Sequence, residues 1–139
     1  MFDPANEFHR RILERLESDR VIWLTTVSPS GQPQPSPVWF WWNGEEFLVY
    51  SGATGRIANL RANPKVALNL DSEPEKGSEQ ITIIEGVARV DPSTPPPGQM
   101  PGYLERYDRL ITGIGLDRES FSEHYRFPIW IRPLKVRGW

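Results

Sequence analysis

The stretch FLVYSGATGRIANLRANPKVALNL, residues 47–70, changes its periodicity twice. It opens on FLVYS, an apolar run with the aromatic and β-branched residues that favour a strand. Small residues follow, and Ile57 and Leu60 then lie at helical spacing until Asn63-Pro64 ends the pattern. VALNL resumes strand-like character. The stretch therefore predicts one short helix inserted between two strands of a sheet.

Two more strands are expected before this stretch. Residues 21–27, VIWLTTV, are rich in β-branched and aromatic side chains, and the Ser-Pro-Ser-Gly run at 28–31 supplies the turn that ends such a strand. Residues 34–42 form the expected return strand. Asn43-Gly44 then predicts a two-residue type I′ hairpin, in which both turn residues have positive φ.

The remaining strands follow a polar loop predicted for residues 71–79. Residues 80–90 read as one long strand interrupted by Gly86, and the closing IWI and LKVRGW segments read as two strands around Pro133. No βαβ alternation dominates the chain. The patterns predict a mainly β protein with helices (α+β), built as a six-stranded antiparallel barrel.

Three or four helices accompany these strands. Asp3-Pro4 predicts the start of an amphipathic helix at the N-terminus. A proline-rich segment, residues 93–102, predicts an ordered loop, and an amphipathic helix follows from Tyr103 to Ile114. Asp117 predicts the N-cap of a last, shorter helix.

Composition narrows the class of function. The 139 residues suit a single domain, 1–139, and 16 basic against 18 acidic side chains leave a net charge of −2. Such a charge provides no general field for nucleic acid. The chain has no cysteine and no apolar run near the ~20 residues of a membrane helix. We therefore expect a cytoplasmic protein without a nucleic-acid or membrane partner.

Catalytic side chains are scarce. The sequence contains no HExxH pair and no GxSxG elbow, and His9 and His124 lie among charged neighbours. The carboxylates between Asp71 and Glu79 are typical of a solvated loop. The sequence therefore assigns no catalytic residue and no metal site.

The segment Thr54-Gly55-Arg56 has the pattern of an anion site. A strand gives way there to small residues and a helix, so the free N–H groups of the first turn can face an anion beside the Arg56 guanidinium. Arg61 and Lys65 are further cations nearby. In the alternative interpretation Thr54 only caps the helix and Arg56 is solvent-exposed. The sequence alone favours neither.

The aromatic run Trp39 to Trp42 is the second informative pattern. Alternation in a strand places Trp39 and Trp41 on one face and Phe40 and Trp42 on the other. A small barrel does not need both faces for its core, so the spare face predicts a partner surface or a planar ligand. The alternative is that these rings pack only in the core and in a dimer interface. Prolines at positions 33, 35 and 37 favour an edge location for the first half of the strand.

These two patterns, in this order and joined by the Asn-Gly hairpin, resemble the pyridoxamine 5′-phosphate oxidase-like family of split β-barrels. The likeness extends from the first helix to the terminal IWIRPLKVRGW, and the PVWF of residues 37–40 and the closing RGW are similar to the F-420-dependent reductase branch. The resemblance implies a homodimer with its cofactor, F-420 or FMN, in the subunit interface.

The resemblance also implies roles for particular residues. The second strand would place a group of residues beside the cofactor ring, namely Ser36, Pro37, Val38, Trp39 and Phe40. The cofactor phosphate would be held by Thr54, Gly55 and Arg56, with Tyr50 and Ser51 nearby and Gln80 reaching the cofactor from the other subunit. Lysine is usual at the position of Arg56, and this departure leaves the choice between F-420 and FMN open.

The expected function is reduction of a small organic substrate by reduced F-420, chemistry that requires no side-chain base. An FMN-dependent oxidoreductase, a non-catalytic binder of flavin, deazaflavin or haem, and a purely structural dimer are the alternatives. The acidic tail of F-420 would require a basic groove, for which the candidates are Arg61, Lys65, Arg132, Lys135 and Arg137. The proline-rich segment and the helix after it are expected to shape substrate specificity.

Overall fold

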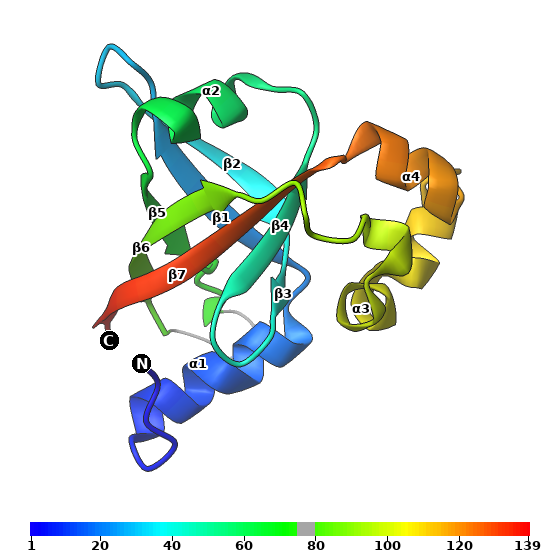
Figure 1. Cartoon of the computed structure of the whole chain (residues 1–139). Coiled ribbons are helices and arrows are strands. Elements are labelled where there is room, and N and C mark those ends of the chain that lie inside the picture. Colours follow the sequence, from blue (N-terminus) through cyan, green and yellow to red (C-terminus); the bar gives the residue numbers. More distant parts are fainter. Residues whose placement is uncertain (75–79) are drawn as a thin grey trace.

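The computed structural model describes residues 1–74 and 80–139, so part of the predicted 71–79 loop lies outside the described residues. Within those residues the chain forms an α+β fold of seven strands and four α-helices (Figure 1). The helices are α1 (Glu7–Ser18), α2 (Gly55–Ala62), α3 (Pro101–Gly113) and α4 (Arg118–His124), and a 3-10 turn, η2, spans Pro97–Gln99. The strands are β1 (Val21–Val27), β2 (Pro33–Trp39), β3 (Trp41–Trp42), β4 (Phe47–Ser51), β5 (Lys65–Asn69), β6 (Thr82–Val90) and β7 (Phe127–Gly138).

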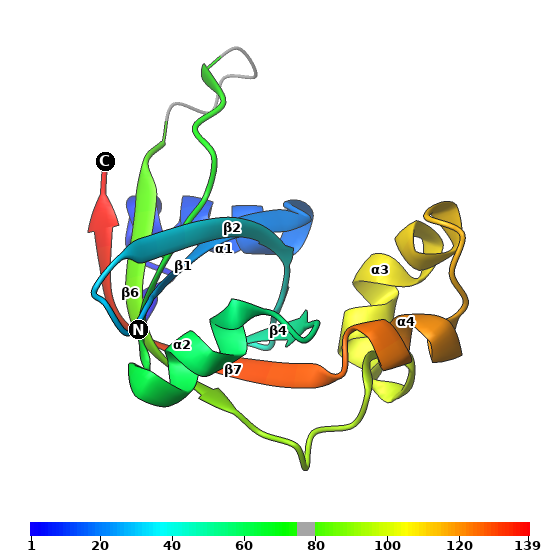
Figure 2. The same cartoon turned by 90° about the horizontal axis from the view of Figure 1, so that it is seen from above.

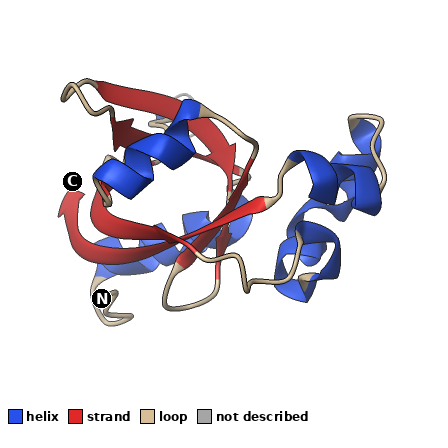
Figure 3. Cartoon of the chain, turned by 45° about the horizontal axis from the view of Figure 1, so that its top comes forward, coloured by secondary structure: helices blue, strands red, loops and turns tan. Residues whose placement is uncertain are grey.

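All seven strands belong to one curled antiparallel sheet, in the order β2-β1-β5-β6-β7-β4-β3. Its two end strands, β2 and β3, are consecutive halves of one bent segment, which pairs first with β1 and then with β4. The predicted antiparallel α+β class is confirmed, but the sheet has seven strands among the described residues and not the predicted six. Helix α2 lies against β1 and β6 at one end of the curled sheet, and α1 lies at the opposite end (Figures 1 and 3).

The bend at Phe40 corrects the predicted uninterrupted strand over residues 34–42. Side chains of helix α3 form hydrogen bonds with both backbone groups of Phe40. The Tyr107 hydroxyl accepts from the Phe40 N–H over 2.8 Å, and Arg106 Nε donates to the Phe40 carbonyl oxygen over 2.9 Å. The Tyr107 hydroxyl also lies 2.6 Å from that carbonyl oxygen. Because these groups are satisfied by α3, the strand breaks there without leaving a buried polar group unpaired.

Two apolar clusters share β4, whose five residues are all buried. Phe47 and Val49 face the interior of the curled sheet, whereas Leu48 and Tyr50 face α3 and α4. Figure 2 shows these two helices standing to one side of the sheet. β4 therefore acts as a wall between the main core and a smaller helical layer.

The predicted alternation of the aromatic run is confirmed, since Phe40 and Trp42 pack with the main cluster and Trp39 and Trp41 with the helical one. The idea that one aromatic face remains uncovered needs correction. The Trp39 ring stacks on Tyr107 at 4.8 Å and on Phe121 at 5.6 Å between ring centroids. Helices α3 and α4 of the same chain thus cover much of this face.

The closing segment forms one strand, β7, rather than two strands around Pro133. Gly86 interrupts β6 as predicted: the register shifts from Glu85–Lys135 to Gly86–Pro133, which leaves Leu134 out of the pairing. A Cβ on Gly86 would lie 2.8 Å from the Arg132 carbonyl oxygen, so only glycine fits at this bulge. Because the ladder is already broken there, Pro133 is tolerated without its N–H.

The β3–β4 turn differs from the predicted type I′ hairpin. Gly44 has φ 100°, but no non-glycine residue, Asn43 included, has positive φ among residues 1–74 and 80–139. The Asn43 side chain instead accepts hydrogen bonds from the N–H groups of Glu45 and Glu46, each over 2.8 Å. Asn43 therefore stabilises a longer loop through its side-chain oxygen.

The first helix begins later than predicted. Asn6, rather than Asp3, is the N-cap of α1, and its side chain accepts from the His9 N–H. Asp117 caps α4 as predicted, accepting from the Ser120 N–H over 2.8 Å. Over residues 1–74 and 80–139, no helix has the length and apolar character needed to cross a membrane.

Candidate functional site

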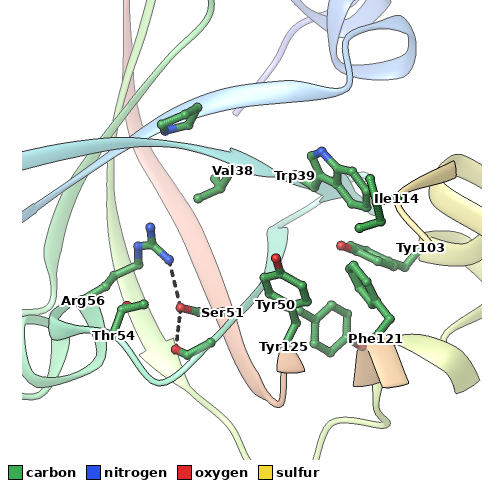
Figure 4. A pocket seen from close by; sticks show the side chains of 12 residues that line it. Val38, Trp39, Tyr50, Ser51, Thr54, Arg56, Tyr103, Ile114, Phe121 and Tyr125 are labelled. Carbon is green, nitrogen blue, oxygen red and sulfur yellow. Dashed lines mark hydrogen bonds between the residues drawn. The ribbon is translucent and has the colours of Figure 1, made fainter. Parts of the chain in front are cut away.

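A cavity of about 310 Å³ lies between β2, β4, the start of α2 and the α3–α4 layer (Figure 4). Its walls come from segments that are far apart in the sequence. The predicted site residues that line it are Pro37, Val38, Trp39, Tyr50, Ser51, Thr54 and Arg56. The lining residues that the sequence did not single out are Gly52, Tyr103, Ile114, Phe121 and Tyr125.

The polar end of the cavity is centred on Arg56. Its guanidinium donates to the Ser51 hydroxyl over 2.8 Å and to the Ser36 hydroxyl over 2.5 Å. No ion pair joins Arg56 to a carboxylate in the part of the chain that the structure describes. Burial lowers the pKa of Arg56, which means that its charge is only partly compensated by solvent. An anion entering the cavity would supply that compensation.

The start of α2 adds N–H donors to this end. Thr54 occupies the N-cap position with extended backbone angles, but its side chain makes no capping hydrogen bond. The interpretation in which Thr54 only caps the helix is therefore not supported, and its hydroxyl is left for another acceptor. The Ile57 N–H donates to the Thr54 carbonyl oxygen over 3.2 Å, and the earlier N–H groups of the first turn, which have no intrahelical acceptors, contribute to the same anion-favouring environment.

The opposite end of the cavity is aromatic. Trp39, Tyr103, Phe121 and Tyr125 line it together with Ile114. Sequence periodicity had marked the helix after the proline-rich segment as amphipathic and as relevant to specificity, but it could not show which side chains face β2 and β4. That information depends on how α3 and α4 fold back on the sheet.

Tyr50 joins this wall to the proline-rich segment. Its hydroxyl donates to the Pro95 carbonyl oxygen over 2.6 Å, and burial raises its pKa. Trp130, on the neighbouring strand β7, likewise donates through Nε1 to the Thr94 hydroxyl over 2.8 Å. The segment is thus anchored to the sheet, as expected for an ordered loop. The Tyr50 hydroxyl proton is therefore used in the contact with Pro95.

Several predicted site residues lie elsewhere. Phe40 has no exposed surface and sits in the main core, so it does not line the cavity. Gly55 begins α2 and does not line the cavity. Ser36 does not line the cavity either, but its hydroxyl accepts a hydrogen bond from Arg56, which does. Gln80 donates to the Phe8 carbonyl oxygen over 3.0 Å beside α1. Its contact with a cofactor held by another subunit stays a prediction.

The basic side chains suggested for an acidic cofactor tail also lie outside the cavity lining. Arg61 is exposed in the last turn of α2, and Lys65 is exposed at the start of β5. Arg132 and Lys135 are exposed on β7, and Arg137 lies 3.4 Å from Glu85. The cavity of one chain therefore has a single basic side chain, Arg56, within its described lining.

The two histidines occupy ordinary positions. His9 accepts through Nδ1 from the Asp3 N–H over 3.0 Å, and His124 ends α4. A Cβ on Gly52 would lie 3.2 Å from the His124 carbonyl oxygen, so α4 approaches the cavity closely at this glycine. Residues 1–74 and 80–139 contain no group of three or more histidine and carboxylate side chains arranged to hold a metal ion.

Comparisons with known proteins agree with this architecture. An F420 reductase is 25% identical with a TM-score of 0.69, covering 89% of this chain and 94% of its own. HutZ, the haem storage protein from Vibrio cholerae, is 19% identical with a TM-score of 0.65, covering 95% and 94%. A conserved hypothetical protein from Mycobacterium tuberculosis is 20% identical with a TM-score of 0.70, covering 94% and 82%. The last two likenesses show the fold alone.

The search of curated proteins returned no match. The family described as pyridoxamine 5′-phosphate oxidase, however, matches residues 8–139. This match spans every helix and strand from β1 to β7 and includes the whole lining of the cavity. The chain belongs to the pyridoxamine 5′-phosphate oxidase family.

Proposed function

We propose that the protein is an oxidoreductase that uses reduced F-420 to reduce a small organic substrate, with the cofactor phosphate bound at Arg56. The observation that carries the proposal is a partly buried guanidinium that has two hydroxyl partners and opens on an aromatic cavity. The 25% identity to an F420 reductase supports the choice of deazaflavin. Family membership supports a phosphate-bearing cofactor more generally.

The residues present fit such a cofactor. Arg56, Thr54 and the first-turn N–H groups of α2 would hold the phosphate, because all are donors without a competing carboxylate. Val38 and Trp39 offer the flat apolar surface that a ring system requires. When bound, the cofactor supplies hydride chemistry, and the chain orients the reactants and excludes water.

An FMN-dependent oxidoreductase is the second candidate, and one observation favours it. The described cavity lining contains one basic side chain, Arg56, and none of the additional basic residues that the acidic tail of F-420 was expected to need. FMN ends at its phosphate and requires no such groove. A non-catalytic binding protein would use the same residues, and turnover alone separates it from an enzyme.

Titration of the apoprotein with F-420 and with FMN, followed by tryptophan fluorescence, tests these alternatives. We expect micromolar or tighter binding of F-420 and weaker binding of FMN, with quenching of Trp39 because it lines the cavity. A Trp39→Phe variant should lose the part of the quenching that comes from Trp39, and its affinity should fall only modestly because phenylalanine keeps an aromatic ring at this position. Tighter binding of FMN would move the protein to the second candidate, and binding of neither would contradict both.

Turnover is measured next, on whichever complex forms. Oxidation of the reduced cofactor that depends on an added organic acceptor is the expected result. Tight binding without such oxidation would instead identify a storage or sensor protein. The catalytic part of the proposal would then be wrong, and the binding part would stand.

We also propose that the protein works as a homodimer, as the family likeness implies. Two apolar side chains near the C-terminal end of β7 are exposed in the single chain, Leu134 at 50% and Trp139 at 79%, and association would bury them. Sedimentation should give twice the chain mass of 16.0 kDa, and Leu134→Glu should shift the protein toward the monomer. A 16.0 kDa species at concentrations that bind cofactor would contradict the proposal.

A further inference from the structure

The Tyr103 hydroxyl faces the cavity and has no hydrogen-bond partner in the described part of the chain. The Tyr103 side chain as a whole is 1% exposed. The neighbouring tyrosines differ: the Tyr50 hydroxyl donates to the Pro95 carbonyl oxygen, and the Tyr107 hydroxyl bonds the Phe40 backbone. The Tyr103 hydroxyl oxygen is not among the fully enclosed polar atoms that lack a partner in the described residues, so it reaches the open space of the cavity. A free hydroxyl that points into a cavity is therefore suited to a ligand (Figure 4).

The Tyr103 ring is held firmly in place. It meets the Tyr50 ring edge-on at 4.9 Å, and it lies 4.7 Å from Tyr107 and 6.3 Å from Phe121. Arg106, three positions further along α3, fixes the same helix to the Phe40 carbonyl oxygen. The hydroxyl thus has a defined position, so the Tyr103 side chain loses little conformational entropy when a ligand binds.

The same burial keeps this hydroxyl a donor. Desolvation raises the pKa of Tyr103, and Tyr107 and Tyr50 add smaller effects in the same direction. The phenol therefore remains protonated at neutral pH. A neutral donor in an apolar wall favours an oxygen acceptor and gives no preference for a cation.

We propose that the Tyr103 hydroxyl donates a hydrogen bond to the carbonyl oxygen of a flat, largely apolar substrate in the aromatic end of the cavity. Trp39 and Phe121, whose rings stack on each other, line that end with apolar ring atoms, and Ile114 adds an aliphatic side chain. The catalytic role rests on the proposed function. For a substrate with a carbon–carbon double bond conjugated to that carbonyl, the reduced cofactor would supply the hydride and be oxidised. The electron pair of the double bond would shift toward the carbonyl oxygen, and the Tyr103 hydrogen bond would stabilise the charge there. The balancing proton comes from solvent water.

Binding of a matched pair of probes tests this assignment without any cofactor. Acetophenone has an aromatic ring and a carbonyl group, whereas ethylbenzene has nearly the same shape without the oxygen. Tyr103→Phe should weaken acetophenone binding about tenfold, equivalent to about 1.4 kcal/mol, and leave ethylbenzene binding unchanged. The carbonyl stretch of bound acetophenone should be lowered in the wild-type protein and not in the variant.

Two controls separate a ligand contact from a structural effect. Tyr125→Phe removes the hydroxyl of another lining tyrosine, 37% exposed, and should keep the wild-type preference for acetophenone. Tyr103→Phe should unfold at the wild-type temperature, because the free protein loses no hydrogen bond. Equal acetophenone affinity in Tyr103→Phe and wild type would overturn the proposal, as would loss of the preference in Tyr125→Phe.

The cofactor titration keeps this proposal distinguishable from the proposed function. Tyr103→Phe should bind F-420 and FMN as the wild type does, because the phosphate end at Arg56 is untouched. A retained acetophenone preference without binding of either cofactor would uphold the Tyr103 contact and reject the proposed function. Normal cofactor binding with no acetophenone preference would do the reverse.

Discussion

Replacement of Arg56 by alanine is expected to weaken binding of the preferred cofactor about 100-fold. Charge-assisted hydrogen bonds contribute about 1.5–3 kcal/mol each, and about 2.7 kcal/mol corresponds to 100-fold in affinity. Within the described lining of the cavity, Arg56 is the one cationic side chain, so no neighbour can take its place. Fluorescence titration at fixed ionic strength measures the change.

Two variants serve as controls for this result. Arg56→Lys keeps the charge but loses the guanidinium fork that reaches both Ser36 and Ser51, so an intermediate loss is expected. Arg61→Ala removes an exposed cation of the same helix and should leave affinity unchanged. Wild-type affinity in Arg56→Ala for both cofactors would refute the phosphate assignment.

Phe40→Ala is expected to lower the free energy of unfolding by about 3–5 kcal/mol, the range for truncating a buried phenylalanine. The side chain has no exposed surface, and the Arg106 guanidinium lies 4.8 Å from its ring centre. The truncation would leave a cavity in the main core beside Phe47, whose ring lies 6.0 Å away. Urea unfolding measured by circular dichroism gives the change.

Phe40→Leu provides the matched control, because it keeps most of the apolar volume and should cost less than the alanine variant. The placement of Phe40 inside the core would be contradicted by a different pattern. If Phe40→Ala unfolded like the wild type but lost cofactor affinity, the ring would line the cavity, as the family resemblance implies.

Local patterns in the sequence predicted much of the fold. Runs of β-branched, aromatic and other apolar residues located β1 and β4, and the switch to helical spacing at Ile57 located α2. The opposite orientation of Trp39 and Phe40 followed from strand geometry alone. These features depend on near neighbours, which is why sequence periodicity reports them.

The features that sequence reasoning missed depend either on distant contacts or on a choice between nearby caps. At the strand break, Arg106 and Tyr107 bond the backbone of Phe40 across 66 and 67 positions of sequence. The first helix begins at Asn6 although Asp3-Pro4 has equally good capping chemistry. The Asp3 side chain instead accepts a hydrogen bond from the Ala5 N–H over 2.9 Å, which stabilises a turn before the helix.

The two ends of the candidate site differ in the same way. The polar end was predictable because Ser51, Thr54 and Arg56 lie within one short stretch, whereas the hydrogen bond from Arg56 to Ser36 crosses 20 positions of sequence. The aromatic end depends on Tyr103 and Phe121, which reach the cavity only because α3 and α4 pack against β4. No spacing within α3 or α4 identifies that contact surface.

A crystal structure of the protein with bound F-420 tests the central claim most directly. We expect phosphate oxygens within hydrogen-bonding distance of the Arg56 guanidinium and the Thr54 hydroxyl, with the ring system along Val38 and Trp39. A phosphate bound elsewhere, with Arg56 still bonded only to Ser36 and Ser51, would contradict it.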